Sequence, residues 1–472
     1  MSRAVVVAVL GLSISSWALA AEQSAPAYQP FPNGYGYMDP SEIAALQRAW
    51  KDGDHTVVRE HGWWLWAGIM QRASDANWPV WFTWPNTKAA FLPAAGLEAT
   101  QTNATPALSL LQRNKLNIVV PVNVKKVPYY PIPADVLKNY PKPTQNCGQD
   151  NICDGSHFLF NGDILVPTES LSQEGFDWIR GTRLYLQETL NTDHQNGLHE
   201  LSAPQRYVVT KHMFWPVKAD RISAIPVWHD YFDKRYPDYA GYERWPDLAA
   251  IDPTGRSVGK KMPVSYLYGV YQSDKTTPWP TVSTSAKVYG LNDFYYHKVT
   301  ADDWNSFDDA DKAILNAASY WSYNQPFGVG DLLVTIAMHV NTKEIPTWAL
   351  QSVWWSDRPN AGPYAANRPK IPQARGPWNH YLLVDSYGIP DKSGDQPVAT
   401  NPYIELVIHP VGTNCNNCHN RAGWPSGKNA GQASYQNPDC PNSLQTLSPS
   451  SACLAPLTLS DFQWIIPDRT IK

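Results

Sequence analysis

Hydrophobic and polar positions follow a helical period near the start of the chain. In residues 41–51, Ile43 and Leu46 recur at helical spacing behind Ser41, a residue type that caps helix N-termini. A second apolar stretch at 63–69 extends the pattern. The N-terminal region is therefore predicted to be helical.

Further along, the apolar positions fall into short alternating or β-branched runs separated by Pro and Gly. A late helix is predicted at 301–323, where Phe307 and Ile314 share a side. Because helices and strands are segregated along the chain, the predicted fold class is α+β: a helical N-terminal region, a mainly antiparallel β core and a loop-rich C-terminal segment. The runs predict strands at 116–124, 206–210, 331–340, 349–355, 381–385 and 403–409.

A Pro-, Ala-, Asn- and Gly-rich segment at 358–377 is the best candidate for a linker, with a long surface loop as the alternative. We divide the chain into a large aromatic-rich α+β domain at 21–377 and a C-terminal region at 378–472. This second region is too rich in loops to fold easily alone. We expect it to pack against the strands at 331–356.

Composition narrows the class of protein. The chain has 472 residues, 17% of them charged, with a formal charge of −4, which excludes a disordered chain and argues against nucleic-acid binding. It also has 21 Trp, which indicate an aromatic-packed core, with an aromatic groove for a ligand as the alternative. The tryptophans that define this choice stand at positions 63, 64, 66, 78, 81 and 84.

The first twenty residues have the pattern of a secretory signal peptide. Arg3 precedes an apolar run at 4–12, and Ala18-Leu19-Ala20 is a small-x-small cleavage site. The run is too short for a membrane anchor, and no other segment predicts a span. We therefore expect cleavage after Ala20, a periplasmic mature chain without a membrane span, and cysteines that can form disulfides.

One pair of cysteines belongs to a motif that indicates cofactor attachment. Cys415, Cys418 and His419 form a C-x-x-C-H sequence, which in an exported protein is typical of covalent c-type haem attachment. The two thiols bind two vinyl groups of one porphyrin, and the adjacent imidazole then lies under the iron. A redox-active pair or half of a zinc site is the rival hypothesis, but no second closely spaced Cys or His pair follows.

The other four cysteines are predicted to be structural. Their spacing favours the local disulfides Cys147–Cys153 and Cys440–Cys453, although four cysteines allow three pairings.

The sixth iron ligand is not evident, because no Met or His follows His419. It is supplied from upstream, by an unusual group such as Lys or Tyr, or is absent. His339 is a candidate on the mixed face of its predicted strand, and His409 is another, whereas Met338 has core neighbours. Arg421 is a candidate partner for a haem propionate. Lesser ligand candidates are His212, Met213, His297 and His380.

The C-terminal third resembles a group of exported bacterial mono-haem cytochrome c family proteins. The likeness covers 331–472 and is carried by Met-His-Val-Asn-Thr-Lys-Glu-Ile-Pro-Thr-Trp at 338–348, Trp-Trp at 354–355, Asn-Pro-Tyr-Ile-Glu at 401–405 and the haem motif. It implies one haem c, export, attachment through Cys415 and Cys418, and His419 as axial ligand, but no defined substrate. The chain is more loosely similar to the cytochrome P460 type, which combines a β-rich fold with a haem motif near the C-terminus and an open iron position.

Three hypotheses follow. The favoured one is a periplasmic electron-transfer protein with a protein redox partner, since a haem edge at the surface is all that this function needs. The large size and the missing distal ligand favour instead a haem peroxidase or oxidase that acts on a small molecule. The third is an aromatic-groove binding or sensor protein.

Overall fold

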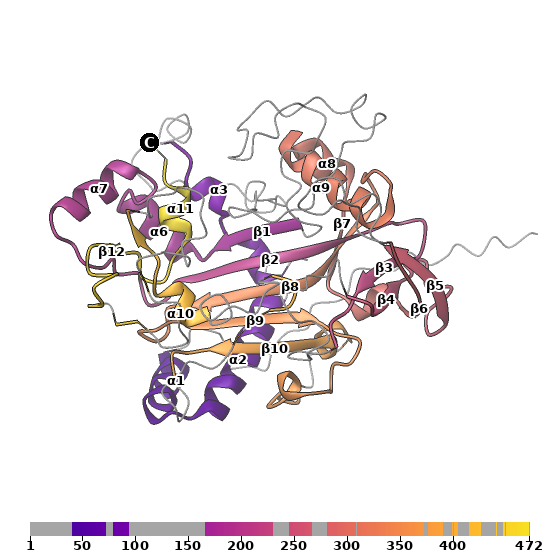
Figure 1. Cartoon of the computed structure of the whole chain (residues 1–472), viewed down its shortest axis with the longest axis horizontal. Helices are drawn as coiled ribbons and strands as arrows, with labels where there is room; N and C mark the ends of the chain where they lie inside the picture. The colour runs from indigo at the N-terminus through magenta and orange to yellow at the C-terminus, as the bar shows by residue number, and fades with distance from the viewer. Residues whose placement is uncertain are drawn as a thin grey trace, which may run out of the picture.

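The computed structural model describes residues 40–71, 79–93, 166–229, 245–266, 281–307, 309–371, 376–389, 399, 401–404, 415–425, 440, 447–448 and 450–471. It confirms the α+β class, with helices at the N-terminal side of a mainly antiparallel sheet (Figure 1). The predicted signal peptide, the strand at 116–124, His409 and the pair Cys147–Cys153 lie outside the described residues.

Two helices form the N-terminal region, as predicted. Helix α1 spans Pro40–Asp52 and helix α2 spans His55–Met70. Asp54 separates them: its side chain accepts hydrogen bonds from the backbone N–H groups of residues 56 and 57 and so caps α2. Gly53 precedes this cap at φ +68°, a backbone conformation that glycine adopts without steric cost.

The central sheet has the strand order β1-β2-β8-β9-β10, and β7 pairs with part of β8. Every pairing in it is antiparallel. The predicted strands at 331–340, 349–355 and 381–385 coincide with the middle and one edge of this sheet. Its strands are β1 (Val166–Leu171), β2 (Val208–Val217), β7 (Tyr296–Lys298), β8 (Leu332–Thr342), β9 (Ala349–Trp355) and β10 (Tyr381–Ser386).

A smaller sheet lies beside one end of the central sheet (Figure 1) and has the order β3-β4-β6-β5. The pairing of β4 with β6 is parallel and the other two pairings are antiparallel. Its strands are β3 (Ser223–Pro226), β4 (Leu248–Ile251), β5 (Lys261–Tyr266) and β6 (Val282–Tyr289).

The late helix predicted at 301–323 is two helices. Helix α8 spans Ala301–Ser306 and helix α9 spans Asp309–Tyr323. Phe307 follows α8 in an extended conformation, with φ −72° and ψ 135°, and its side chain is buried. The helical hydrogen bonding therefore ends at Phe307, where the chain turns this aromatic ring into the core.

The remaining elements are short. They are η1 (Val80–Thr83), α3 (Thr87–Ala90), α6 (Gln173–Gly181), α7 (Gln187–Gln195), η5 (Leu291–Asp293), η6 (Pro363–Ala365), η7 (Gly376–His380), α10 (Cys415–His419), β11 (Gly423–Trp424), β12 (Thr458–Leu459) and α11 (Ile465–Arg469). Of the predicted strand at 403–409, the described residues Tyr403 and Ile404 form a turn.

The two faces of the central sheet are covered by different parts of the chain. Side chains that are paired directly across an antiparallel sheet share a face. We call one side the N-terminal face, defined by His212, Met338, Val353, Leu383 and Asp385; α2 contacts it, and Arg59 of α2 bonds Asp385 at 2.6 Å. The other side, the C-terminal face, is defined by Lys211, His339, Ser352 and Val384, together with Ser386 two residues further along β10. In Figure 1, α2 passes behind the sheet and α10 lies in front of it.

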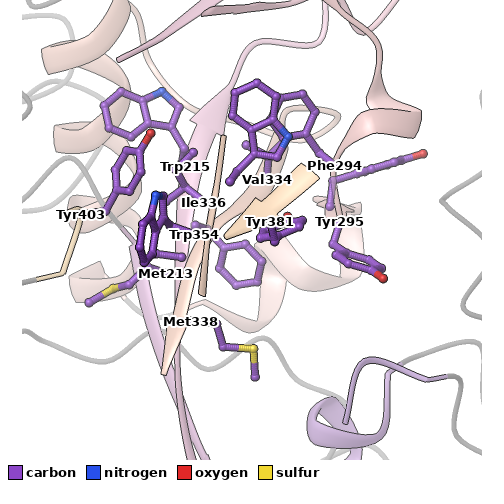
Figure 2. Packing of buried hydrophobic residues seen from close by; sticks show 14 of the residues in the cluster. Met213, Trp215, Phe294, Tyr295, Val334, Ile336, Met338, Trp354, Tyr381 and Tyr403 are labelled. Atoms are coloured by element: carbon purple, nitrogen blue, oxygen red, sulfur yellow. The ribbon is translucent and has the colours of Figure 1, made fainter. Parts of the chain in front are cut away.

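The core fills both faces of β8. Met338, Ile336 and Val334 are fully buried, which confirms the prediction that Met338 is a core residue. In Figure 2, Met213 and Trp354 lie to one side of this strand, and Tyr381 and Tyr295 to the other.

The described tryptophans at the N-terminal side also favour packing over a groove. Trp63, Trp66 and Trp81 are at most 3% exposed, and all three belong to the main hydrophobic cluster. Trp64 and Trp84 are partly exposed and pack against the same cluster, and Trp78 lies outside the described residues.

The segment expected to be a linker packs on the body of the protein where it is described. Arg59 donates hydrogen bonds to the backbone carbonyls of Tyr364 at 2.8 Å and Leu383 at 2.7 Å, and so holds the segment beside β10. Since β10 belongs to the central sheet, the first part of region 378–472 is continuous with the large domain.

Candidate functional site

Helix α10 carries the C-x-x-C-H motif and presents two different faces. Cys418 and His419 follow Cys415 by three and four residues and so lie on the same side of the helical turn as Cys415. All three are partly exposed, whereas Asn416 and Asn420, on another side, are buried. The asparagine side is therefore the one that the protein covers, and the thiols and the imidazole lie where its packing is looser.

Asn416 anchors α10 to the edge of the central sheet. Its side-chain Nδ2 donates to the backbone oxygen of Thr347 at 2.7 Å. Its backbone N–H donates to Oγ of Ser386, the last residue of β10, at 3.3 Å. These two bonds fix the helix on the C-terminal face of the sheet.

The two cysteines are thiols and are not joined in a disulfide. The Cys415 thiol donates to the backbone oxygen of Ala399 at 3.3 Å. Cys440 and Cys453, in contrast, form the predicted disulfide. The structure thus distinguishes a pair of thiols from a disulfide-bonded pair.

His419 is held in one tautomer by the backbone. Its Nδ1 lies 2.7 Å from the carbonyl oxygen of Phe462, and a carbonyl oxygen can only accept. Nδ1 therefore carries the proton, and the lone pair of the neutral ring is on Nε2. A metal-bound histidine typically donates its other ring N–H to a carbonyl or carboxylate in this way. The side chain thus fits the role of an axial ligand.

A buried carboxylate positions this carbonyl. Asp461 is 2% exposed and accepts hydrogen bonds from Lys343 Nζ at 2.6 Å, Trp348 Nε1 at 2.9 Å and the backbone N–H of Ala203 at 2.8 Å. Asp461 and Phe462 both have left-handed backbones, with φ +49° and +65°. The three donors hold this unusual turn in place, and the turn directs the Phe462 oxygen at His419.

Arg421 lies two residues after the motif and is only 3% exposed. Burial lowers the pKa of its guanidinium, and the negative charge of an ionised Cys418 partly opposes that change. Arg421 therefore places a positive charge two residues from His419, the charge that the predicted interaction with a haem propionate requires.

The structure places His339 on the same face of the sheet as α10. It is the one residue of β8 that is partly exposed, and it pairs with Lys211 on one side and Ser352 on the other. Among the lesser candidates, His212 lies on the N-terminal face, 1% exposed, and bonds Thr335 Oγ1 at 2.6 Å. Burial lowers its pKa to about 3, which keeps it neutral.

Two further histidines have carboxylate partners away from α10. His297 Nε2 lies 2.9 Å from Asp303 Oδ2, and His380 Nε2 lies 3.4 Å from Asp293 Oδ1. Both pairs explain the side chains without a metal.

Asp461 and Phe462 are functional residues that the sequence does not predict. The role of Phe462 belongs to a backbone oxygen, which every residue type has, and so leaves no signal in the sequence. Asp461 has one weak signal, because Asp is among the few residue types other than Gly that adopt left-handed backbones.

No helix among the described residues is long and apolar enough to cross a membrane. Within those same residues, no group of three or more His, Cys, Asp or Glu side chains is arranged to hold a metal ion. Comparison with family models, with curated proteins and with solved structures finds no match for this chain.

Proposed function

We propose that this chain is an exported mono-haem c-type cytochrome that transfers electrons. Cys415 and Cys418 would bind the haem covalently, and His419 Nε2 would be an axial ligand of its iron. The observation that carries the proposal is the 2.7 Å bond from His419 Nδ1 to the Phe462 oxygen, which gives the imidazole the tautomer that such a ligand requires. A disulfide-bonded cysteine pair has no need of this bond.

When bound, the haem supplies an iron that cycles between the ferric and ferrous states. The chain's own residues have supporting roles. Asn416 fixes the helix to the sheet, the turn at Asp461 and Phe462 orients the imidazole, and Arg421 offers a positive charge to a propionate. Electron transfer needs only that a haem edge reach the surface, and the partial exposure of the motif side of α10 meets that condition.

Export is part of the proposal. The signal-peptide pattern at residues 1–20 motivates it, and the Cys440–Cys453 disulfide supports it, because such bonds persist in oxidising compartments. The electron donor or acceptor would then be a periplasmic protein or a small molecule.

The test is covalent haem on the exported full-length chain, produced with haem-attachment machinery. We expect the denatured protein to keep one haem, seen as a mass increase and a haem absorption band. Cys415→Ser with Cys418→Ser should lose it, whereas the control, Cys440→Ser with Cys453→Ser, should keep it. An exported chain without covalent haem would refute the proposal.

His419→Ala tests the axial role separately. We expect the haem to stay attached through its thioethers while the absorption spectrum changes, because the iron loses its imidazole. His199→Ala, at an exposed histidine, is the control. An unchanged spectrum in His419→Ala would remove that assignment. Substrate turnover by an open iron would favour the peroxidase or oxidase alternative.

A further inference from the structure

We infer that His339 is the second axial ligand of the haem held by α10. This inference rests on the proposed function, and it selects one of the upstream candidates from the geometry of the sheet. Three sets of contacts bring His339 to the haem motif, and each comes from a different part of the chain.

The first set is the register of the sheet. Directly paired side chains form a row across the C-terminal face, made of Glu169, Lys211, His339, Ser352 and Val384. Ser386, which accepts the bond from α10, lies two residues beyond Val384 on the same face. His339 is two strands away from it. With strands about 4.8 Å apart and about 3.4 Å per residue, their Cα atoms are ~12 Å apart. His339 therefore lies ~12 Å, Cα to Cα, from the residue of β10 that anchors α10.

The second set comes from Cys415. Its thiol bonds the backbone oxygen of Ala399, and two residues later Asn401 donates from Nδ2 to Ser352 Oγ at 2.8 Å. Ser352 is the register partner of His339. One attachment cysteine is thus linked, through a short piece of chain, to the position next to the proposed ligand.

The third set comes from the other end of the row. The chain that follows Phe462 forms α11, and Arg469 Nη2 in that helix lies 2.8 Å from Glu169 Oε2. Asp468 interacts electrostatically with Lys211. The segments that surround the motif therefore contact both ends of the row, and His339 lies between them.

Packing places Cys415 beside this row. On this face, the adjacent row on one side contains Met213, Ala337, Trp354 and Leu382 of the main hydrophobic cluster. The adjacent row on the other side contains Leu171, Val209 and Leu350 of a second cluster. Cys415 packs against both clusters, so it lies over the boundary between them, where the row that contains His339 runs.

The position also has the rigidity that a ligand needs. β8 is paired on both sides, by β2 and β9. Met338 and Val340, which flank His339 in the sequence, are at most 1% exposed. The backbone of His339 is thus fixed, while its partly exposed ring points to the side where α10 lies. Imidazoles on both sides of the iron would give a low-spin haem, the form suited to electron transfer.

The test uses the exported full-length protein with covalent haem. The wild type should be low-spin in both oxidation states and should not bind carbon monoxide. His339→Ala should keep the covalent haem, become high-spin and bind carbon monoxide, and added imidazole should restore the low-spin spectrum. His199→Ala should behave as the wild type does.

His339→Met is the second variant, useful if the alanine variant does not fold. We expect it to remain low-spin with a higher reduction potential, because a thioether in place of an imidazole raises the potential of a haem. An unchanged potential would overturn the inference. A His339→Ala variant that stays low-spin and inert to carbon monoxide would do the same while the proposed function stands. A high-spin wild type would also overturn the inference; its covalent haem would still support a c-type cytochrome, but the open iron would favour the peroxidase or oxidase alternative. Failure of the proposed function is a different result, namely no covalent haem on the wild type.

Discussion

Replacement of Asp461 should destabilise the protein more than replacement of a carboxylate on the surface. Asp461→Ala leaves Lys343, whose side chain is 18% exposed, without its counter-ion, and removes the acceptor of Trp348 Nε1 and the Ala203 N–H. Loss of one partner of a buried ion pair costs about 3–5 kcal/mol. We therefore expect the free energy of unfolding to fall by roughly 3–5 kcal/mol.

The assay is urea unfolding of the full-length protein, followed by tryptophan fluorescence. Asp220→Ala is the matched control: Asp220 bonds Arg221 at 2.8 Å, but their side chains are 65% and 45% exposed, so its loss should cost less than about 1 kcal/mol. Asp461→Asn keeps an acceptor and a residue type that tolerates the left-handed backbone, and should cost about 1–3 kcal/mol. If Asp461→Ala costs no more than Asp220→Ala, the three hydrogen bonds do not hold this turn and the reasoning is wrong.

Two further predictions concern the rest of the fold. A Cβ on Gly175 would lie 2.2 Å from the buried ring of Tyr207, so Gly175→Ala should lower the thermal midpoint, at a cost of about 1–3 kcal/mol. Gly181→Ala in the same helix, where a Cβ would meet nothing within 4 Å, should change the stability by less than about 1 kcal/mol. Equal midpoints for the two variants would contradict this prediction. Burial disfavours a charged His61, but Glu344, 3.0 Å away and buried, outweighs burial through its charge and hydrogen bond, and the pKa of His61 is raised above 6.5. The stabilisation from this pair is then complete below pH 6.5 and is lost as pH rises through the raised pKa. Urea midpoints measured from pH 6 to 9 should therefore fall for the wild type but not for His61→Gln. Equal dependence of the midpoint on pH in the two proteins would argue against this prediction.

The sequence predicted the middle of the central sheet well, because buried strands there are continuous apolar runs. The prediction at 349–355 matches β9, and the prediction at 331–340 differs from β8 by one or two residues at each end. β1 was missed because Pro167 and Glu169 interrupt it, and proline is tolerated only because β1 lies at the sheet edge. In the smaller sheet, β3 and β4 were missed because they have four residues each, too few for a period to show.

In the candidate site, too, the residues that form a local pattern could be predicted from the sequence, and those that depend on tertiary contacts could not. Cys415, Cys418 and His419 are adjacent in sequence, and their chemistry dictates their spacing. The acceptor of the His419 proton, 43 residues away, depends on a backbone turn that no residue pattern announces. His339 stood out only as one of several histidines until the register showed which face it shares with α10.

The way in which the C-terminal segment is joined to the rest has a consequence for the order of folding. Ile471 exchanges backbone hydrogen bonds with Tyr185 and Gln187, and Leu459 does so with His199 and Leu201, across more than 250 residues of chain. Contacts between such distant positions form late, because the loop between them must first be closed. Phe462 belongs to this segment, so the carbonyl that fixes the His419 ring arrives only after the motif itself has been synthesised. On the proposed function, attachment of haem to the two thiols of α10 would fall in the interval before this segment docks.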